Sequence, residues 1–65
     1  MKSLTHAEAA DMLVRASQRG QLRLLNDVRH PSGALHLRWQ VGGMRLDEVF
    51  PHNGAECTHS LDGAR

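Results

Sequence analysis

The sequence predicts an α+β fold in which an N-terminal helix packs on a three-stranded antiparallel meander (α-β-β-β), followed by an irregular tail. Three observations predict it: a capped helical stripe over residues 5–19, a change of apolar period from 3.6 to 2 after Gly20, and two glycine-containing turns beyond it. A chain of 65 residues has room for one small domain. We expect residues 1–50 to form that domain and residues 51–65 to be an irregular or partly ordered tail.

The helix has the clearest boundaries of any element in the sequence. Thr5 followed three residues later by Glu8 is a capping box, in which each side chain accepts a hydrogen bond from the other residue's backbone N–H. Gly20 suits the left-handed residue that follows a helix. The apolar positions between these signals recur at three-and-four spacing and predict one buried stripe, formed by Ala9, Met12, Leu13 and Ala16.

Three half-buried strands are expected after the helix. Apolar residues alternate with polar ones over 21–29, 34–41 and 44–50. The segment 30–33, which holds a proline and a glycine, is a turn signal, and Gly42-Gly43 supplies the positive φ angles of a two-residue hairpin turn. Pro51 has no N–H to give to a ladder and ends the last strand.

Tight turns also fix the register of the two hairpins. The first turn pairs Val28 with Leu37, and the second pairs Leu35 with Phe50. Both registers place the apolar residues on one sheet face. A slip of one residue would turn every side chain of a strand to the other face, so this agreement supports the meander.

Two polar residues interrupt the inward apolar pattern, Asn26 and Glu48. A buried carboxylate without a partner is costly. Glu48 is therefore expected at an open sheet margin or at a bulge, and the remaining alternative is a specific role. The tail after Pro51 has little apolar content, and we expect irregular structure or one short extra strand around 55–59.

A three-stranded meander leaves two open edges, at 21–29 and 44–50, whose unpaired backbone groups can bind another strand. The helix offers only Met12 and Leu13 as large side chains, too few to cover the apolar face. We therefore expect a small non-enzymatic interaction or regulatory protein that binds a protein partner or itself, as a homodimer, through a sheet edge or the uncovered face. The alternative is a monomer whose tail closes the gap through Leu61.

The candidate partner-binding residues are of two kinds. The polar candidates on the strands are Arg23, Arg29, His36 and Arg45. The apolar candidates are Leu25, Trp39 and Phe50. Leu25 is notable because it faces outward in the expected register, on the polar side of the sheet.

The alternative function is nucleic-acid binding by the arginine-bearing face. The expected register weakens it by placing Arg38 between Asp27 and Asp47 in a ladder of opposite charges. A neutralised arginine offers little to a phosphate. The formal net charge of +1 does not by itself indicate a polyanionic partner.

The sequence of the tail contains a weak signal for metal binding. His52, Cys57 and His59 lie close together and offer the thiolate and imidazole ligands that suit Zn²⁺. Their spacing matches no standard zinc motif, and nothing selects a fourth ligand from His30, His36 or Asp62. We expect no metal and no cofactor.

Catalysis has two candidate pairs. Cys57 with His59 or His52 contains a nucleophile and a base, and Glu48 with His36 could be an acid and a base across neighbouring strands. Neither pair has a third group to orient it, and no nucleotide-binding or zinc-protease motif is present. We expect no enzymatic activity and infer no small-molecule substrate.

The single cysteine and the lack of long apolar runs predict a cytoplasmic location. A single cysteine cannot form an internal disulfide, which favours a reducing cytoplasm. No apolar run is long enough to span a bilayer, so we expect no membrane association, and the N-terminal residues do not follow a signal-peptide pattern. Seven of the eight basic residues are arginine, which is typical of a GC-rich bacterial or phage genome.

Overall fold

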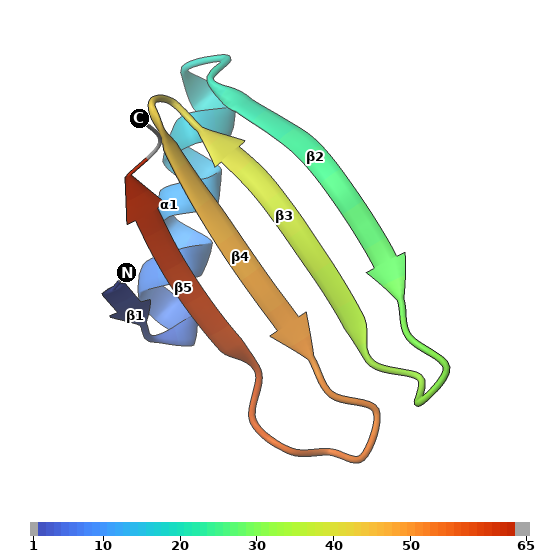
Figure 1. The fold of residues 1–65 in the computed structure, drawn as a ribbon. Coiled ribbons are helices and arrows are strands. Elements are labelled where there is room, and N and C mark those ends of the chain that lie inside the picture. The colour runs from blue at the N-terminus through green and yellow to red at the C-terminus, as the bar shows by residue number, and fades with distance from the viewer. Residues whose placement is uncertain (1, 64–65) are drawn as a thin grey trace.

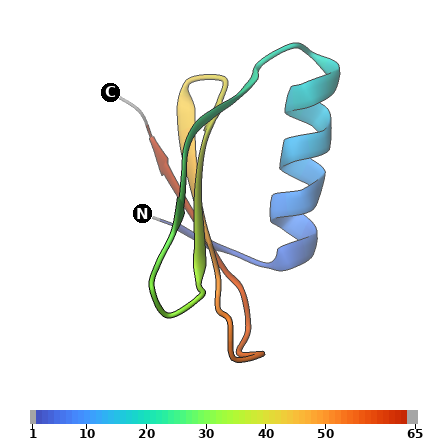
Figure 2. The same cartoon turned by 90° about the vertical axis from the view of Figure 1, so that its right-hand side faces the viewer.

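The computed structural model describes residues 2–63, which form one helix and five strands. Their bounds are β1 Lys2–Leu4, α1 His6–Gln18, β2 Leu22–Arg29, β3 Leu35–Val41, β4 Met44–Phe50 and β5 Thr58–Gly63. All neighbouring strands pair antiparallel in one sheet of order β1-β5-β4-β3-β2 (Figure 1). The helix packs on one side only (Figure 2). We call that side the helix-side face and the opposite side the open face.

The predicted three-stranded meander with an irregular tail is wrong, because β1 and β5 extend the sheet to five strands. Only Leu61 marks β5 as an apolar strand, since the other two residues that it places on the helix-side face are His59 and Gly63. β1 has three residues, too few for a period to be visible. The alternative of an extra strand around 55–59 overlaps only the first two residues of β5.

The predicted helix is confirmed. Thr5 is the N-cap, and its hydroxyl accepts a hydrogen bond of 3.1 Å from the Glu8 backbone N–H. The Glu8 carboxylate in turn accepts one of 2.9 Å from the Thr5 backbone N–H. Gly20 follows with φ of 69°, the left-handed conformation that ends the helix.

The capping box predicts a pH dependence of stability. The backbone and side-chain hydrogen bonds of Thr5, with the nearby charge of Lys2, hold the pKa of Glu8 below its usual value of 4.5. A lowered folded-state pKa stabilises the fold above pH 4.5, and this contribution is lost as the pH falls further. Glu8→Gln should flatten the dependence of the urea midpoint on pH below 4.5. Glu56→Gln, in an exposed loop, should leave it as in the wild type, and an equal effect of both changes would contradict the prediction.

The second hairpin has the predicted register, and the first does not. Leu35 pairs with Phe50 across β3 and β4. In the first hairpin, the register shifts between Leu24 and Asn26, which leaves Leu25 as the extra residue of a bulge. The predicted pairing of Val28 with Leu37 is also wrong, because residues 26–29, between the bulge and the turn, pair one position away from the prediction.

After this bulge, the side chains of β2 lie on the opposite faces from those that regular alternation would give them. Val28 pairs with His36 and lies on the open face, whereas Asp27 pairs with Leu37 on the helix-side face. Asn26 pairs with Arg38, so it also lies on the open face and not at the inward position that was expected. An added residue changes the side of every residue after it, because side chains alternate along a strand.

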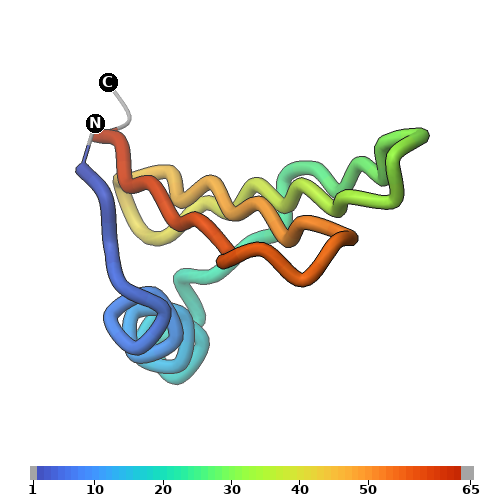
Figure 3. The backbone as a smooth tube through the Cα atoms, turned by 90° about the horizontal axis from the view of Figure 1, so that it is seen from below, coloured from blue at the N-terminus to red at the C-terminus, as the bar shows by residue number. Residues whose placement is uncertain are grey.

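The core is small. Among the described residues, the buried apolar side chains are Leu46, Ala9 and Ala16. Figure 3 shows why: the helix lies beneath one end of the strands, and the loops 30–34 and 51–57 extend past it. The tail contributes Leu61, which pairs with Leu46 and is half-buried, as the monomer alternative expects.

The open edges differ from those predicted. β2 is an edge strand, as expected, and seven of its eight residues are exposed. The segment 44–50 is not an edge, because β5 pairs with it, and β1 is the second edge. Within residues 2–63, no helix has the length and apolar character that crossing a membrane requires.

Candidate functional site

A chain of hydrogen-bonded side chains runs through the helix-side face from β3 to the start of α1. Trp39 Nε1 donates to Glu48 Oε1 at 2.8 Å. Glu48 Oε2 lies 2.7 Å from His59 Nδ1, and His59 Nε2 lies 3.3 Å from His6 Nδ1. We call these four residues the relay.

The sheet positions three members of the relay. Trp39 lies on β3, Glu48 on β4 and His59 on β5, and the β4–β5 register places Glu48 directly opposite His59. The Phe50 ring meets the His59 ring edge-on, with centroids 6.2 Å apart. His6 is the first residue of α1, so the capping box that starts the helix also places its imidazole next to His59.

The relay is partly buried. Glu48 is 4% exposed and His59 is 3% exposed, and they are the buried polar residues of residues 2–63. Both Glu48 carboxylate oxygens have a donor, which offsets the cost of removing that charge from water. A hydrogen-bonded carboxylate and imidazole that take up so much of a small core suggest a function beyond stability.

His6 connects the buried part of the relay to the surface. It is exposed, and it lines a pocket of about 500 Å³ together with Leu4, Thr5, Glu56 and Cys57. The Nδ1 atom of His6 contacts His59, which leaves Nε2 as the ring nitrogen available to a ligand. The relay therefore joins a buried carboxylate to a histidine that solvent and small molecules can reach.

The sequence correctly predicts that Glu48 faces inward, but the position in the sheet and the side-chain partner that it predicts for Glu48 are wrong. Glu48 lies on the middle strand of the sheet and is paired on both sides, so the sheet-margin and bulge explanations are wrong. His36 lies on the open face, opposite to Glu48, so the two residues do not form the candidate acid and base pair. The actual partner, His59, was missed because the strand that carries it was not recognised.

The three candidate metal ligands of the tail, His52, Cys57 and His59, do not lie together. His59 is buried in the relay, whereas His52 and Cys57 are exposed on the loop before β5. In the described part of the chain, no three histidine, cysteine or acidic side chains are arranged to hold a metal ion.

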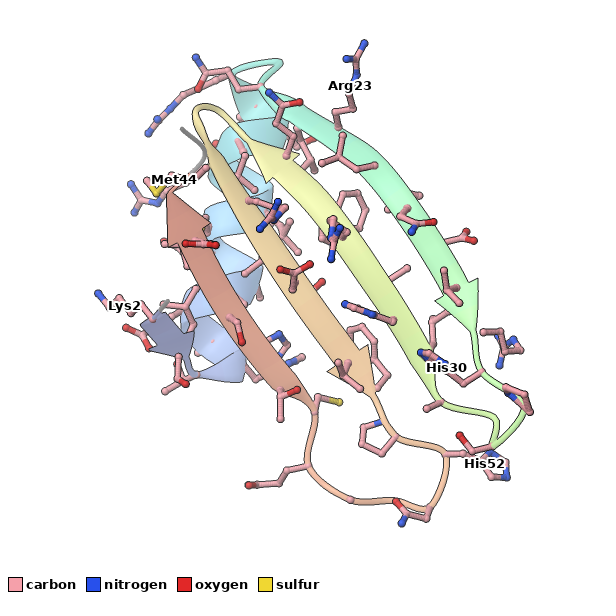
Figure 4. All side chains as sticks on the ribbon, viewed as in Figure 1. Lys2, Arg23, His30, Met44 and His52 are labelled. Atoms are coloured by element: carbon pink, nitrogen blue, oxygen red, sulfur yellow. The ribbon has the colours of Figure 1, made fainter. Side chains whose placement is uncertain are left out.

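The open face carries a charge network centred on Asp47. Arg38 Nε donates to Asp47 Oδ1 at 2.8 Å, and His36 Nε2 lies 3.7 Å from the same oxygen. Figure 4 draws all described side chains with the sheet in front of the helix, so that this face is toward the viewer. Arg45 lies 3.7 Å from Asp47 Oδ2 and 3.3 Å from Asp62. The Arg38–Asp47 half of the predicted ladder is confirmed, and the Asp27 half is wrong because the bulge moves Asp27 to the other face.

The candidate partner-binding residues do not form one surface. His36, Arg45 and Arg23 lie on the open face, and Arg29 pairs with Leu35 on the helix-side face. Leu25 is exposed at the bulge. Trp39 and Phe50 are half-buried on the helix-side face, where Trp39 serves the relay and Phe50 packs on it.

Comparisons with known proteins identify no relative. No protein-family model matches the chain, and no curated protein or solved structure matches it. Two features of this fold point to a function, the exposed edge strand β2 and the relay.

Proposed function

We propose that this protein is a small binding protein that associates with a second copy of itself through the edge strand β2. The observation that carries the proposal is a concentration of exposed apolar side chains on that strand. Among residues 2–63, the exposed large apolar residues are Val14, Leu24, Leu25, Val28 and Met44, and three of these five lie on β2. An edge strand that also exposes apolar side chains is suited to pairing with another strand.

The backbone of β2 supports strand addition. Among residues 2–63, no strand pairs with its outer side, as the right-hand edge of Figure 1 shows. The strand contains no proline, and no lysine that would oppose pairing, although the bulge at Leu25 limits the regular ladder to the segments on either side. Two copies related by a two-fold axis would join their sheets into one.

The charges of β2 favour a second copy as the partner. Asp27 and Arg29 both lie on the helix-side face, on either side of Val28. Antiparallel pairing of two β2 strands about Val28 places Asp27 of each copy opposite Arg29 of the other. Opposite charges at facing positions stabilise a strand pair, and like charges destabilise it.

Nucleic-acid binding has less support in this geometry. Arg38 and Arg45 on the open face are bonded to Asp47 and Asp62, which leaves less free positive charge for phosphates. We therefore keep protein association as the proposal. A duplex that binds with a steep dependence on salt, and that no longer binds after Arg23→Glu with Arg45→Glu, would favour the nucleic-acid alternative.

We expect Val28→Asp to abolish self-association, because Val28 faces the same residue of the second copy at the centre of the pair, and the change puts two like charges opposite each other. The measurement is size-exclusion chromatography with light scattering over a range of concentrations. Val14→Asp is the matched control, since Val14 is also exposed, at 56%, but lies on the helix. A wild type that stays monomeric at the highest concentration, or equal effects of the two changes, would contradict the proposal.

A charge reversal tests the pairing itself. Asp27→Arg places like charges opposite each other and should weaken the dimer, and adding Arg29→Asp should restore it. Restoration requires that these two residues face each other across the interface. Weakening in the single variant without recovery in the double variant would contradict pairing about Val28.

A further inference from the structure

The hydrogen bonds of the relay determine where its protons lie. An ionised carboxylate only accepts hydrogen bonds, so Glu48 accepts one from Trp39 Nε1 and one from His59 Nδ1. Neutral His59 then has a lone pair on Nε2, which accepts the hydrogen bond from His6 Nδ1. Neutral His6 consequently has its free lone pair on Nε2.

We propose that His6 Nε2 is the nucleophile of an acyl-transfer site in the pocket between the start of α1 and the loop before β5, and that its substrates are small activated esters. This function goes beyond the proposed self-association and uses other residues. His6 is the catalytic residue because its Nε2 would meet the substrate. His59 and Glu48 are positioning residues, which act through the His6 ring.

The first step transfers the acyl group to His6. The Nε2 lone pair attacks the ester carbonyl carbon, the new C–N bond forms, and the C–O bond to the alcohol breaks, so the alcoholate leaves. The Nδ1 proton of His6 passes to His59 Nε2, 3.3 Å away. The acylated His6 is then neutral, and the positive charge lies on His59 beside the Glu48 carboxylate, at 2.7 Å.

The second step is hydrolysis. Water attacks the acyl carbon, the C–N bond breaks, and the carboxylic acid leaves. One water proton goes to solvent, where it neutralises the alcoholate, and His6 Nδ1 takes its proton back from His59. The relay thus holds one proton between the two steps, in a part of the protein where a buried carboxylate compensates its charge.

Hydrolysis of p-nitrophenyl acetate tests the nucleophile. We expect His6→Ala to lower the second-order rate constant by about tenfold or more. His52→Ala, which removes another exposed histidine, should change the rate constant by less than about twofold. His6 is exposed, so its replacement should leave the fold intact, which circular dichroism checks. Equal rates for the two variants would overturn the proposal.

Glu48→Gln tests the relay separately from the fold. Trp39 Nε1 can donate only to the amide oxygen, so the glutamine NH₂ group would face His59 Nδ1 and donate to it. The His59 proton must then sit on Nε2 and be donated to His6 Nδ1, which moves the His6 proton to Nε2. The lone pair at the pocket is lost, and we expect a fall in the rate constant of about tenfold or more.

Nitrogen NMR distinguishes a change of tautomer from a general loss of structure in the variant. Long-range ¹H–¹⁵N spectra at a pH where both rings are neutral should show His6 and His59 protonated on Nδ1 in the wild type and on Nε2 in Glu48→Gln. Unchanged tautomers, or a variant with reversed tautomers that still reacts at the wild-type rate, would overturn the mechanism.

Discussion

Leu46→Ala should remove a large share of the stability of the fold. Leu46 is fully buried on the middle strand β4 and is the largest fully buried side chain of the described residues. Truncating a buried leucine to alanine costs about 2 to 5 kcal/mol, and a chain of this length has a free energy of unfolding of about 3 to 10 kcal/mol. Urea denaturation followed by far-ultraviolet circular dichroism would measure the loss.

Met44→Ala is the matched control for this loss. Met44 lies on the same strand and the same face as Leu46 but is 43% exposed, so its truncation should cost less than about 1 kcal/mol. Comparable costs for the two changes would mean that Leu46 is not the centre of the core, and that another surface, such as a dimer interface at β2, supplies most of the stability.

The sequence predicted the elements whose signals are local. The capping box and Gly20 determine the ends of α1, and Gly42, with φ of 60°, makes the turn that sets the β3–β4 register. These features depend on residues that are neighbours in the chain. The bulge at Leu25 does not depend on such neighbours, because it forms through pairing with β3. The order of apolar and polar residues in β2 does not show where the extra residue lies.

The relay, too, could be predicted only where the signal is local in the sequence. Glu48 was correctly expected to face inward, since it belongs to a hairpin with a well-determined register. His59 could not be assigned to it, because β5 exists through its pairing with β4 and β1 rather than through an apolar pattern of its own. One signal was available: His59 and Leu61 alternate with polar residues, which identifies a strand once histidine is allowed an inward position.

The core is small because polar residues of the relay occupy buried positions and because apolar residues of β2 remain exposed. The helix covers one end of the sheet, and there Glu48 and His59 take positions that apolar residues would otherwise occupy. A fold that gives core positions to a carboxylate and an imidazole has less apolar burial to stabilise it. Self-association through β2 would supply burial that the single chain lacks.

His59→Leu should destabilise the fold strongly, and a second mutation should recover part of the loss. The leucine fills the space of the imidazole but leaves Glu48 Oε2 buried without its 2.7 Å partner, which costs about 3 to 5 kcal/mol.

Adding Glu48→Leu removes the unpaired charge, so the double variant should be more stable than His59→Leu alone, as urea denaturation would show. The indole N–H of Trp39 then loses its acceptor, but Trp39 is only half-buried, so we expect that cost to be about 1 kcal/mol and the recovery to exceed it. A double variant less stable than the single one would show that the carboxylate is not destabilising when alone. The contact between Glu48 and His59 would then have no role beyond packing.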